Sequence, residues 1–108
     1  MDAHARSGEI VALTASAAEP SPRTTTLVKS DEFEVLRLVL PAGKELPAHR
    51  SAGEITVQCV EGRTALSAHG RSQELAAGHL VFLAAGEPHA LRAATDSILL
   101  VTRRRSAP

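Results

Sequence analysis

The chain has 108 residues, which suits one domain, and 44% of them are hydrophobic although only 2% are aromatic. Its formal net charge is zero, which argues against the strongly basic surfaces of proteins that bind nucleic acid or anionic membranes. No apolar stretch reaches the roughly 18 residues of a membrane-spanning helix. We therefore expect a core of Val, Leu, Ile and Ala in a protein that binds neither nucleic acid nor membrane.

The order of elements indicates an all-β domain between two tails. Residues 1–23 are rich in Ala, Ser, Thr and Pro, and Pro20 and Pro22 would break any regular element, so a flexible N-terminal arm is expected. From residue 24, short β-branched and aliphatic runs alternate with turn signals, and helical periodicity is absent. The barrel domain is predicted over 24–102, and the basic residues of 103–108 are interpreted as a solvated C-terminal tail. The predicted strands are Thr25–Lys29, Phe33–Leu40, Ile55–Val60, Thr64–Ala68, Ser72–Leu75, Leu80–Leu83, His89–Ala93 and Ser97–Thr102.

Two features of these strands bear on assembly and register. The runs 35–40 and 98–101 are apolar at nearly every position, which is typical of strands buried on both faces by a second sheet or a subunit. A homodimer is therefore expected.

Gly62 and Gly70 each follow a strand and supply the positive φ that tight turns require, and His69-Gly70 is predicted to be a hairpin turn.

Cys59 is the only cysteine, so the chain has no intrachain disulfide framework. A reducing compartment is the simplest location for a free thiol, and this favours a cytoplasmic protein. No low-pKa context or oxyanion-forming glycine run accompanies Cys59, so it is interpreted as a small core residue and not as a nucleophile.

Two histidines forty residues apart each lie in a run punctuated by glycines. These runs are Pro41–Gly62, which contains His49, and Gly78–His89. The spacing of glycine and histidine in both runs resembles the two motifs of the cupin superfamily, over about residues 33–102. The resemblance implies a double-stranded β-helix, the jelly-roll barrel, in which strand-borne histidines distant in sequence meet.

The resemblance carries over only part of a metal site. In metal-binding cupins three histidines and one glutamate hold a divalent ion, and His49 and His89 match two of the histidines. Ser51 stands at the position of the remaining histidine, and Ile55 at that of the glutamate. Two imidazoles would hold manganese, iron, nickel or zinc weakly and with little selectivity.

The register of residues 54–60 decides whether other donors reach the site. Ile55 and alternate residues after it are apolar, whereas Glu54 and Gln58 belong to the polar set that points the other way. If a bulge shifted this register, Glu54 or Gln58 would complete a metal or ligand site.

The function that these residues favour is the binding of a small molecule in the barrel pocket. The expected ligand-binding residues are His49, Ser51, Gln58 and His89, and a weakly held divalent metal is expected at His49 and His89. The alternatives left open are a metal-dependent dioxygenase or isomerase, and a dimeric scaffold whose barrel is filled. Whether the protein is an enzyme stays open.

Overall fold

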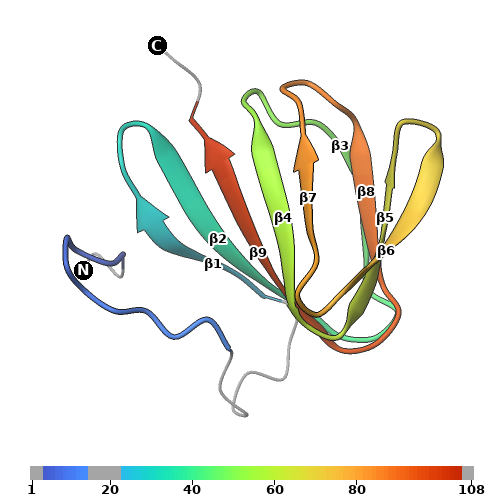
Figure 1. Cartoon of the computed structure of the whole chain (residues 1–108), viewed down its shortest axis with the longest axis horizontal. Coiled ribbons are helices and arrows are strands. Elements are labelled where there is room, and N and C mark those ends of the chain that lie inside the picture. Colours follow the sequence, from blue (N-terminus) through green and yellow to red (C-terminus); the bar gives the residue numbers. More distant parts are fainter. Residues whose placement is uncertain (1–3, 15–22, 106–108) are drawn as a thin grey trace.

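The computed structural model describes residues 4–14 and 23–105, and within these ranges nine strands form two antiparallel sheets (Figure 1). The five-stranded sheet has the order β1-β2-β9-β4-β7, and the four-stranded sheet has the order β3-β8-β5-β6. This is the expected all-β jelly roll, since neighbours in each sheet are mostly distant in sequence. The strands are β1 (Arg23–Lys29), β2 (Phe33–Leu40), β3 (Glu45–His49), β4 (Ile55–Glu61), β5 (Arg63–Ala68), β6 (Arg71–Ala76), β7 (Leu80–Leu83), β8 (His89–Ala93) and β9 (Ser97–Arg104).

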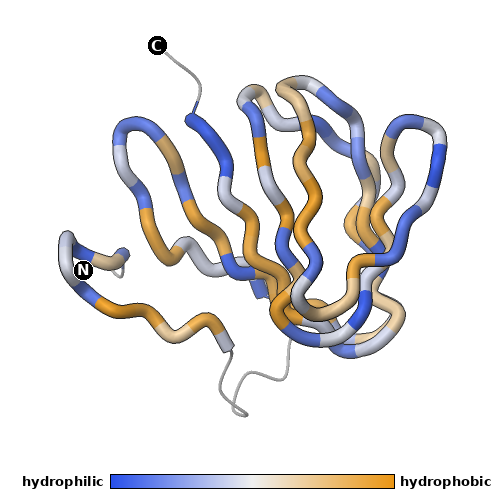
Figure 2. The backbone as a smooth tube through the Cα atoms, viewed as in Figure 1, coloured by the Kyte–Doolittle hydropathy of each residue, from blue (hydrophilic) through white to orange (hydrophobic). Residues whose placement is uncertain are grey.

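The core lies between the sheets and is built by alternation along the strands. Every second residue is buried in β4 and, from Leu36 onward, in β2, and the same pattern from β5 and β8 meets it from the other sheet. Hydrophobic segments run along the middle of most strands, and several of the connecting loops are hydrophilic (Figure 2). The most deeply buried apolar side chains are Val57, Cys59, Leu66, Ala93 and Leu99.

All eight predicted strands are present, several with slightly longer bounds, and the sequence missed one. The missed strand, β3, is an edge strand that pairs only with β8 among the described residues, and it contains Pro47. Proline is tolerated at an edge because its missing N–H need not join a ladder. At the other end of the chain, β9 extends to Arg104, so Arg103 and Arg104 belong to the sheet and not to a solvated tail.

The turn between β5 and β6 confirms the predicted hairpin. His69 and Gly70 both have positive φ, 52° and 74°, as the two central residues of a type I′ turn require. Most connections in this barrel are short, and the strands spread apart toward the end that carries the β3–β4 and β7–β8 loops (Figure 1). We call this the open end.

The described part of the predicted arm, residues 4–14, has no regular structure but contacts the barrel. The amide of Ala5 donates to the carbonyl of Leu27 at 2.9 Å, and an Nη1 group of Arg37 donates to the carbonyl of Ala12 at 3.3 Å. The rest of the predicted arm, apart from Arg23 in β1, lies outside the described residues. Within the described ranges no helix is long and apolar enough to span a membrane.

Candidate functional site

A pocket of about 210 Å³ enters the barrel at its open end. This volume corresponds to roughly seven water molecules, so the pocket suits a ligand smaller than an ordinary drug molecule. Its walls are mainly aliphatic, and two imidazoles, a serine and two arginines supply most of its polar groups. The lining residues are Thr24, Leu36, Leu38, Leu46, His49, Arg50, Ser51, Ile55, Val57, His89, Leu91, Val101 and Arg103.

The two motif histidines lie side by side in this pocket. His49 at the end of β3 is the cross-strand partner of His89 at the start of β8, and their ring centroids are 4.4 Å apart with a tilt of 58°. His89 is 4% exposed, whereas His49 is exposed at the rim. A bulge between Leu46 and His49 shifts the β3 register at this point. The fold thus brings together the two residues that the sequence singled out.

Backbone carbonyls fix which nitrogen of each ring carries the proton. Nδ1 of His89 lies 3.0 Å from the carbonyl oxygen of Glu87, and Nδ1 of His49 lies 3.3 Å from that of Pro47. A carbonyl oxygen only accepts, so each neutral ring donates through Nδ1–H and keeps its lone pair on Nε2. Neither Nε2 has a hydrogen-bond partner among residues 4–14 and 23–105. Both are therefore available to accept a hydrogen bond from a ligand.

The remaining sequence-predicted site residues separate into two groups. Ser51 lines the pocket, and so does Ile55, which is 4% exposed and forms part of its apolar wall. Gln58 does not line the pocket. It lies on the opposite face of β4 from Val57 and Cys59, because side chains alternate along a strand.

This register resolves the alternative left open by the sequence. The apolar set from Ile55 to Cys59 faces inward, and the irregularity in β4 comes later, between Cys59 and Glu61. Neither Glu54 nor Gln58 is brought to the imidazoles by a slipped strand. Within the described ranges no group of three His, Cys, Asp or Glu side chains is placed to hold a metal ion.

Cys59 is a core residue, as its sequence context indicated. Its side chain is fully buried, and Sγ lies 3.3 Å and 3.4 Å from the carbonyl oxygens of Glu61 and Gly62. Burial raises the pKa of the Cys59 thiol, because desolvation penalises the thiolate. A thiol held in its neutral form is a poor nucleophile, so Cys59 takes no part in the site.

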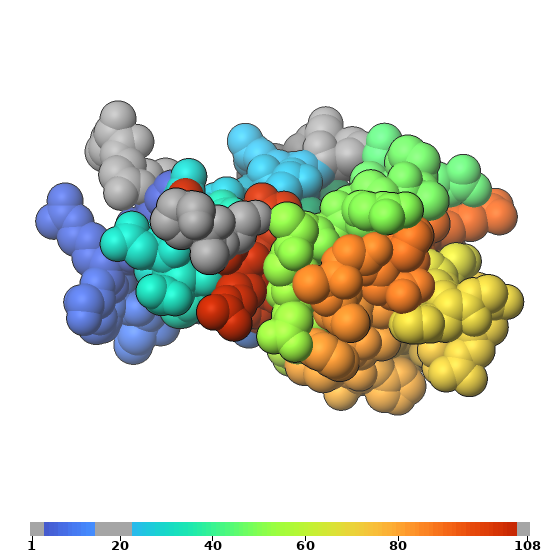
Figure 3. Space-filling model, turned by 90° about the horizontal axis from the view of Figure 1, so that it is seen from above, coloured from blue at the N-terminus to red at the C-terminus, as the bar shows by residue number. Residues whose placement is uncertain are grey.

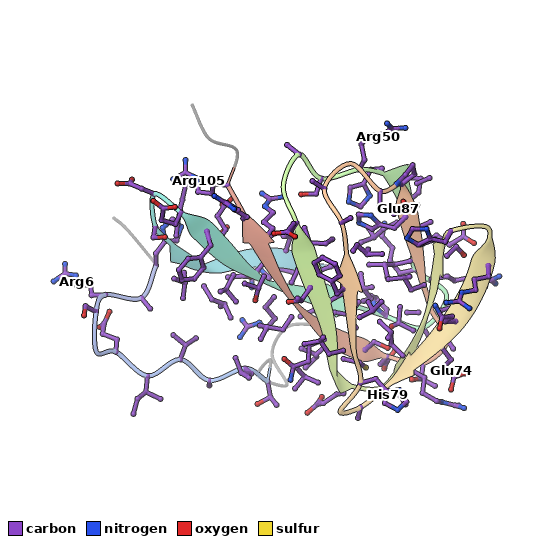
Figure 4. The ribbon with its side chains drawn as sticks, turned by 45° about the horizontal axis from the view of Figure 1, so that its top comes forward. Arg6, Arg50, Glu74, His79, Glu87 and Arg105 are labelled. Carbon is purple, nitrogen blue, oxygen red and sulfur yellow. The ribbon has the colours of Figure 1, made fainter. Side chains whose placement is uncertain are left out.

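The other described histidines lie outside the barrel pocket. His69 forms the β5–β6 turn, where its Nε2 lies 3.5 Å from a carboxylate oxygen of Glu87. His79 accepts a hydrogen bond from the amide of Ala76 in the β6–β7 turn. Figure 4 shows Arg50 and Glu87 at the open end and His79 toward the opposite end.

Sequence reasoning missed the arginines of the pocket. Arg50 follows His49 in the β3–β4 loop, and Arg103 lies near the end of β9. Seen from above, the end of β9 lies beside β4 (Figure 3). The sequence signal for Arg103 was the run of three arginines at 103–105. Because this run was interpreted as a tail, Arg103 was not recognised as continuing the inward-facing residues of β9.

Comparison of the sequence with protein families finds one match, to the cupin domain, over residues 36–102. These residues include the six strands β3 to β8, most of β2 and β9, and both imidazoles of the pocket. No curated protein matches the chain at a significant level.

Solved structures similar to this one are known from several bacteria. A conserved protein of unknown function from Streptococcus pyogenes has a TM-score of 0.81 and 22% identity, covering 96% of this chain and 93% of that chain. A cupin superfamily protein from Desulfitobacterium hafniense has a TM-score of 0.78 and 14% identity, covering 85% and 84%. The DMSP lyase DddQ from Ruegeria pomeroyi has a TM-score of 0.73 and 24% identity, covering 85% and 51%. At these identities the likeness establishes the fold alone.

Proposed function

We propose that this chain, which belongs to the cupin domain family, binds a small polar molecule in its barrel pocket. In this proposal His49 and His89 accept hydrogen bonds from the ligand, Ser51 contacts it at the rim, and the aliphatic wall excludes water from its body. The observation that carries the proposal is the adjacent, tilted pair of imidazoles, each held by a backbone carbonyl, with Nε2 left without a partner among the described residues. A filled barrel without a pocket would give these groups no role.

A metal-dependent enzyme, of the dioxygenase or isomerase type, is the second candidate. It is favoured by the carbonyls behind His49 and His89, since metal-ligating histidines commonly donate their other N–H in this way. The donor set fits it less well. Catalytic metal sites use about three protein ligands, and the wall beside these two imidazoles is formed by Ile55. A metal held by two imidazoles would depend on further donors from the bound molecule itself.

Replacing His89 by Ala should weaken binding of a hydroxyl-bearing probe of suitable size. With phenol as the probe, we expect a loss of about tenfold, because the variant removes a hydrogen-bond acceptor and part of the pocket wall. Binding is measured by NMR titration, following the ring ¹⁵N signals of His49 and His89. In the unsubstituted protein both Nε2 signals should shift on saturation.

Two variants control this measurement. Gln58→Ala removes a polar side chain from the outer face of β4, and His79→Ala removes an imidazole outside the barrel pocket, so neither should change phenol affinity. Benzene, which lacks the hydroxyl, should bind less tightly and leave the Nε2 signals in place. If phenol shifted neither ring, or if Gln58→Ala weakened binding as much as His89→Ala, the barrel-pocket proposal would be wrong.

The proposal includes a homodimer formed through the outer face of the five-stranded sheet. Leu80 and Phe82 on the edge strand β7 are 58% and 56% exposed, and Phe33 on β2 is 41% exposed. Large apolar side chains exposed on one face of a sheet are typical of a protein–protein interface, and a second copy would bury them. By light scattering the protein should have twice its 11.3 kDa mass at micromolar concentration, and Phe82→Lys should shift it toward the monomer. A monomeric unsubstituted protein would refute the dimer without affecting the pocket.

The free, buried thiol of Cys59 bears on the cellular compartment. Unpaired cysteines persist most readily where thiols are kept reduced. On this ground we propose a cytoplasmic location.

A further inference from the structure

The barrel pocket continues at its mouth into a second hollow of about 360 Å³, which is strongly basic. Three lining residues, Arg50, Ser51 and Arg103, are common to both hollows. Four arginines and one glutamate give the second hollow a formal net charge of +3, although the whole chain is neutral. Positive charge is therefore concentrated where a ligand enters the barrel. The charged residues of this hollow are Glu34, Arg50, Arg103, Arg104 and Arg105.

Arg103 connects the two hollows because it occupies an inward-facing position. It follows Val101 in the buried set of β9, and it is the cross-strand partner of Ile55 on β4. Arg103 thus lines the same pocket as the two imidazoles. A fixed positive charge at this place repels a second cation and attracts an anion. The electrostatics of the pocket favour an oxyanion over a metal dication.

A neighbouring carboxylate holds Arg103 in place without using all of its donors. Glu34 is the cross-strand partner of Arg103 on β2, and its Oε1 lies 3.1 Å from Nε of the guanidinium. The Glu34 side chain is 15% exposed, whereas that of Arg103 is 43% exposed. An arginine has five N–H donors, and no other hydrogen bond of this guanidinium is seen within the described ranges. An oriented guanidinium with free donors is suited to bind a carboxylate or phosphate through two parallel hydrogen bonds.

Backbone hydrogen bonds that use no arginine side chain also hold the walls of the basic hollow. The amides of Arg104 and Arg105 donate to the carbonyls of Glu54 and Glu32, so these acidic residues contribute backbone atoms here. A Cβ at Gly53 would collide with the carbonyl oxygen of Arg104, so glycine allows the β3–β4 loop to close against β9.

Arg105 and Arg50 flank this hollow in different ways. Arg105 donates from Nη1 to the carbonyl of Ser30 at 2.7 Å. Arg50 extends from the rim (Figure 4) and forms no ion pair with an acidic side chain in the described part of the chain. The long Arg50 side chain is therefore free to fold over a bound anion.

On the basis of the barrel-pocket function above, we propose that the ligand is a small hydroxylated organic anion. Its oxyanion, a carboxylate or a phosphate, binds Arg103 at the junction of the two hollows, with Arg50, Arg104 and Arg105 adding attraction. Its hydroxyl end enters the barrel and donates to the Nε2 atoms of His49 and His89. The site determines this orientation of the ligand, because the Nε2 lone pairs accept hydrogen bonds from the hydroxyl and would repel the oxyanion.

The test compares acids with their neutral amides at constant shape. ω-Hydroxyalkanoates of four to six carbons and the corresponding hydroxyamides are titrated into the full-length protein at about 20 mM salt, and Kd is measured by calorimetry. At least one acid should bind about tenfold or more tightly than its amide, since hydrogen bonds to charged groups are stronger than neutral ones. Raising the salt to about 500 mM should weaken the acid and leave the amide unchanged. The corresponding ω-hydroxyalkyl phosphates show which oxyanion is preferred.

Three variants assign the effect to Arg103. Arg103→Gln should remove the advantage of the acid over the amide. The double variant Glu34→Gln/Arg103→Gln should do the same. Because it also removes the Glu34 carboxylate, no unpaired buried charge remains that could destabilise the fold and reduce binding for that reason alone. Arg92→Gln removes an equal charge from an exposed surface pair with Glu45, outside both hollows, and should leave the advantage intact.

The outcomes separate this inference from the function on which it rests. Equal binding of acid and amide, with ring ¹⁵N shifts at His49 and His89, would overturn the anion and leave the pocket function standing. An acid preference that survives in both Arg103 variants would also overturn it. If no probe, phenol included, shifted the two rings, the pocket function itself would fail.

Discussion

Ile55→Glu should raise the affinity of the barrel pocket for Mn²⁺ by at least about 100-fold. The substitution places a carboxylate in the wall that the two imidazoles share, so the donor set grows from two to three. Groups that only hydrogen-bond to a metal ligand are worth about 10–100-fold in metal affinity, and a direct ligand should be worth no less. Calorimetric titration with Mn²⁺ measures the gain, and the melting temperature of the variant should rise with added metal.

Arg103 provides a second measurement on the same pocket. As the cross-strand partner of Ile55, its guanidinium should compete with the metal for the new carboxylate. Ile55→Glu/Arg103→Gln should therefore bind Mn²⁺ more tightly than Ile55→Glu alone. Thr56→Glu introduces the same charge on the opposite face of β4 and should give no gain. If Thr56→Glu matched Ile55→Glu, or if folded Ile55→Glu gained nothing, our account of the pocket donors would be wrong.

Local patterns in the sequence predicted most of the fold because most strands are half-buried. Alternation of apolar and polar residues located β4 and its inward face, and glycines located the turns at Gly62 and Gly70. The strand β3 escaped because four of its five residues are exposed, so it has no alternation to detect, and because Pro47 suggests a loop. Its pairing with β8 is a tertiary contact that propensity does not encode.

Local sequence patterns identified only part of the candidate site, because some of its contacts join residues that are distant in the chain. His49 and His89 were identified by spacing, and the structure brings their rings together. Arg103 was not identified, because its role depends on Glu34, which is 69 residues away in the chain and adjacent only across β2 and β9. A run of three arginines at a chain end carries no local sign that one of them faces a pocket. Gln58 was included because the register of β4 was open, and the strand places it on the outer face.

Gly62→Ala should reduce the stability of the fold more than any other single methyl addition at a turn. Gly62 has a φ of +84°, and a Cβ there would collide with the carbonyl oxygen of Asp96 and lie 2.6 Å from Oγ of Ser97. The unfavourable φ costs of the order of 1–3 kcal/mol and the overpacking a similar amount, so a loss of about 4 kcal/mol is expected. In a domain of this size that lowers the melting temperature by roughly 15–30 °C, measured by circular dichroism.

Gly70→Ala is the matched control, and it separates the effect of positive φ from the effect of crowding at position 62. Gly70 has a similar φ of +74°, but nothing lies within 4 Å of its Cβ position, so only the backbone cost of the order of 1–3 kcal/mol applies. The difference between the two variants isolates the contact between the β4–β5 and β8–β9 turns, where the Ser97 hydroxyl also bonds to the carbonyl of Thr95 at 2.8 Å. If the two melting temperatures fell equally, that contact would be unimportant. A large difference would show that Gly62 closes the end of the barrel opposite the open end by packing against the β8–β9 turn.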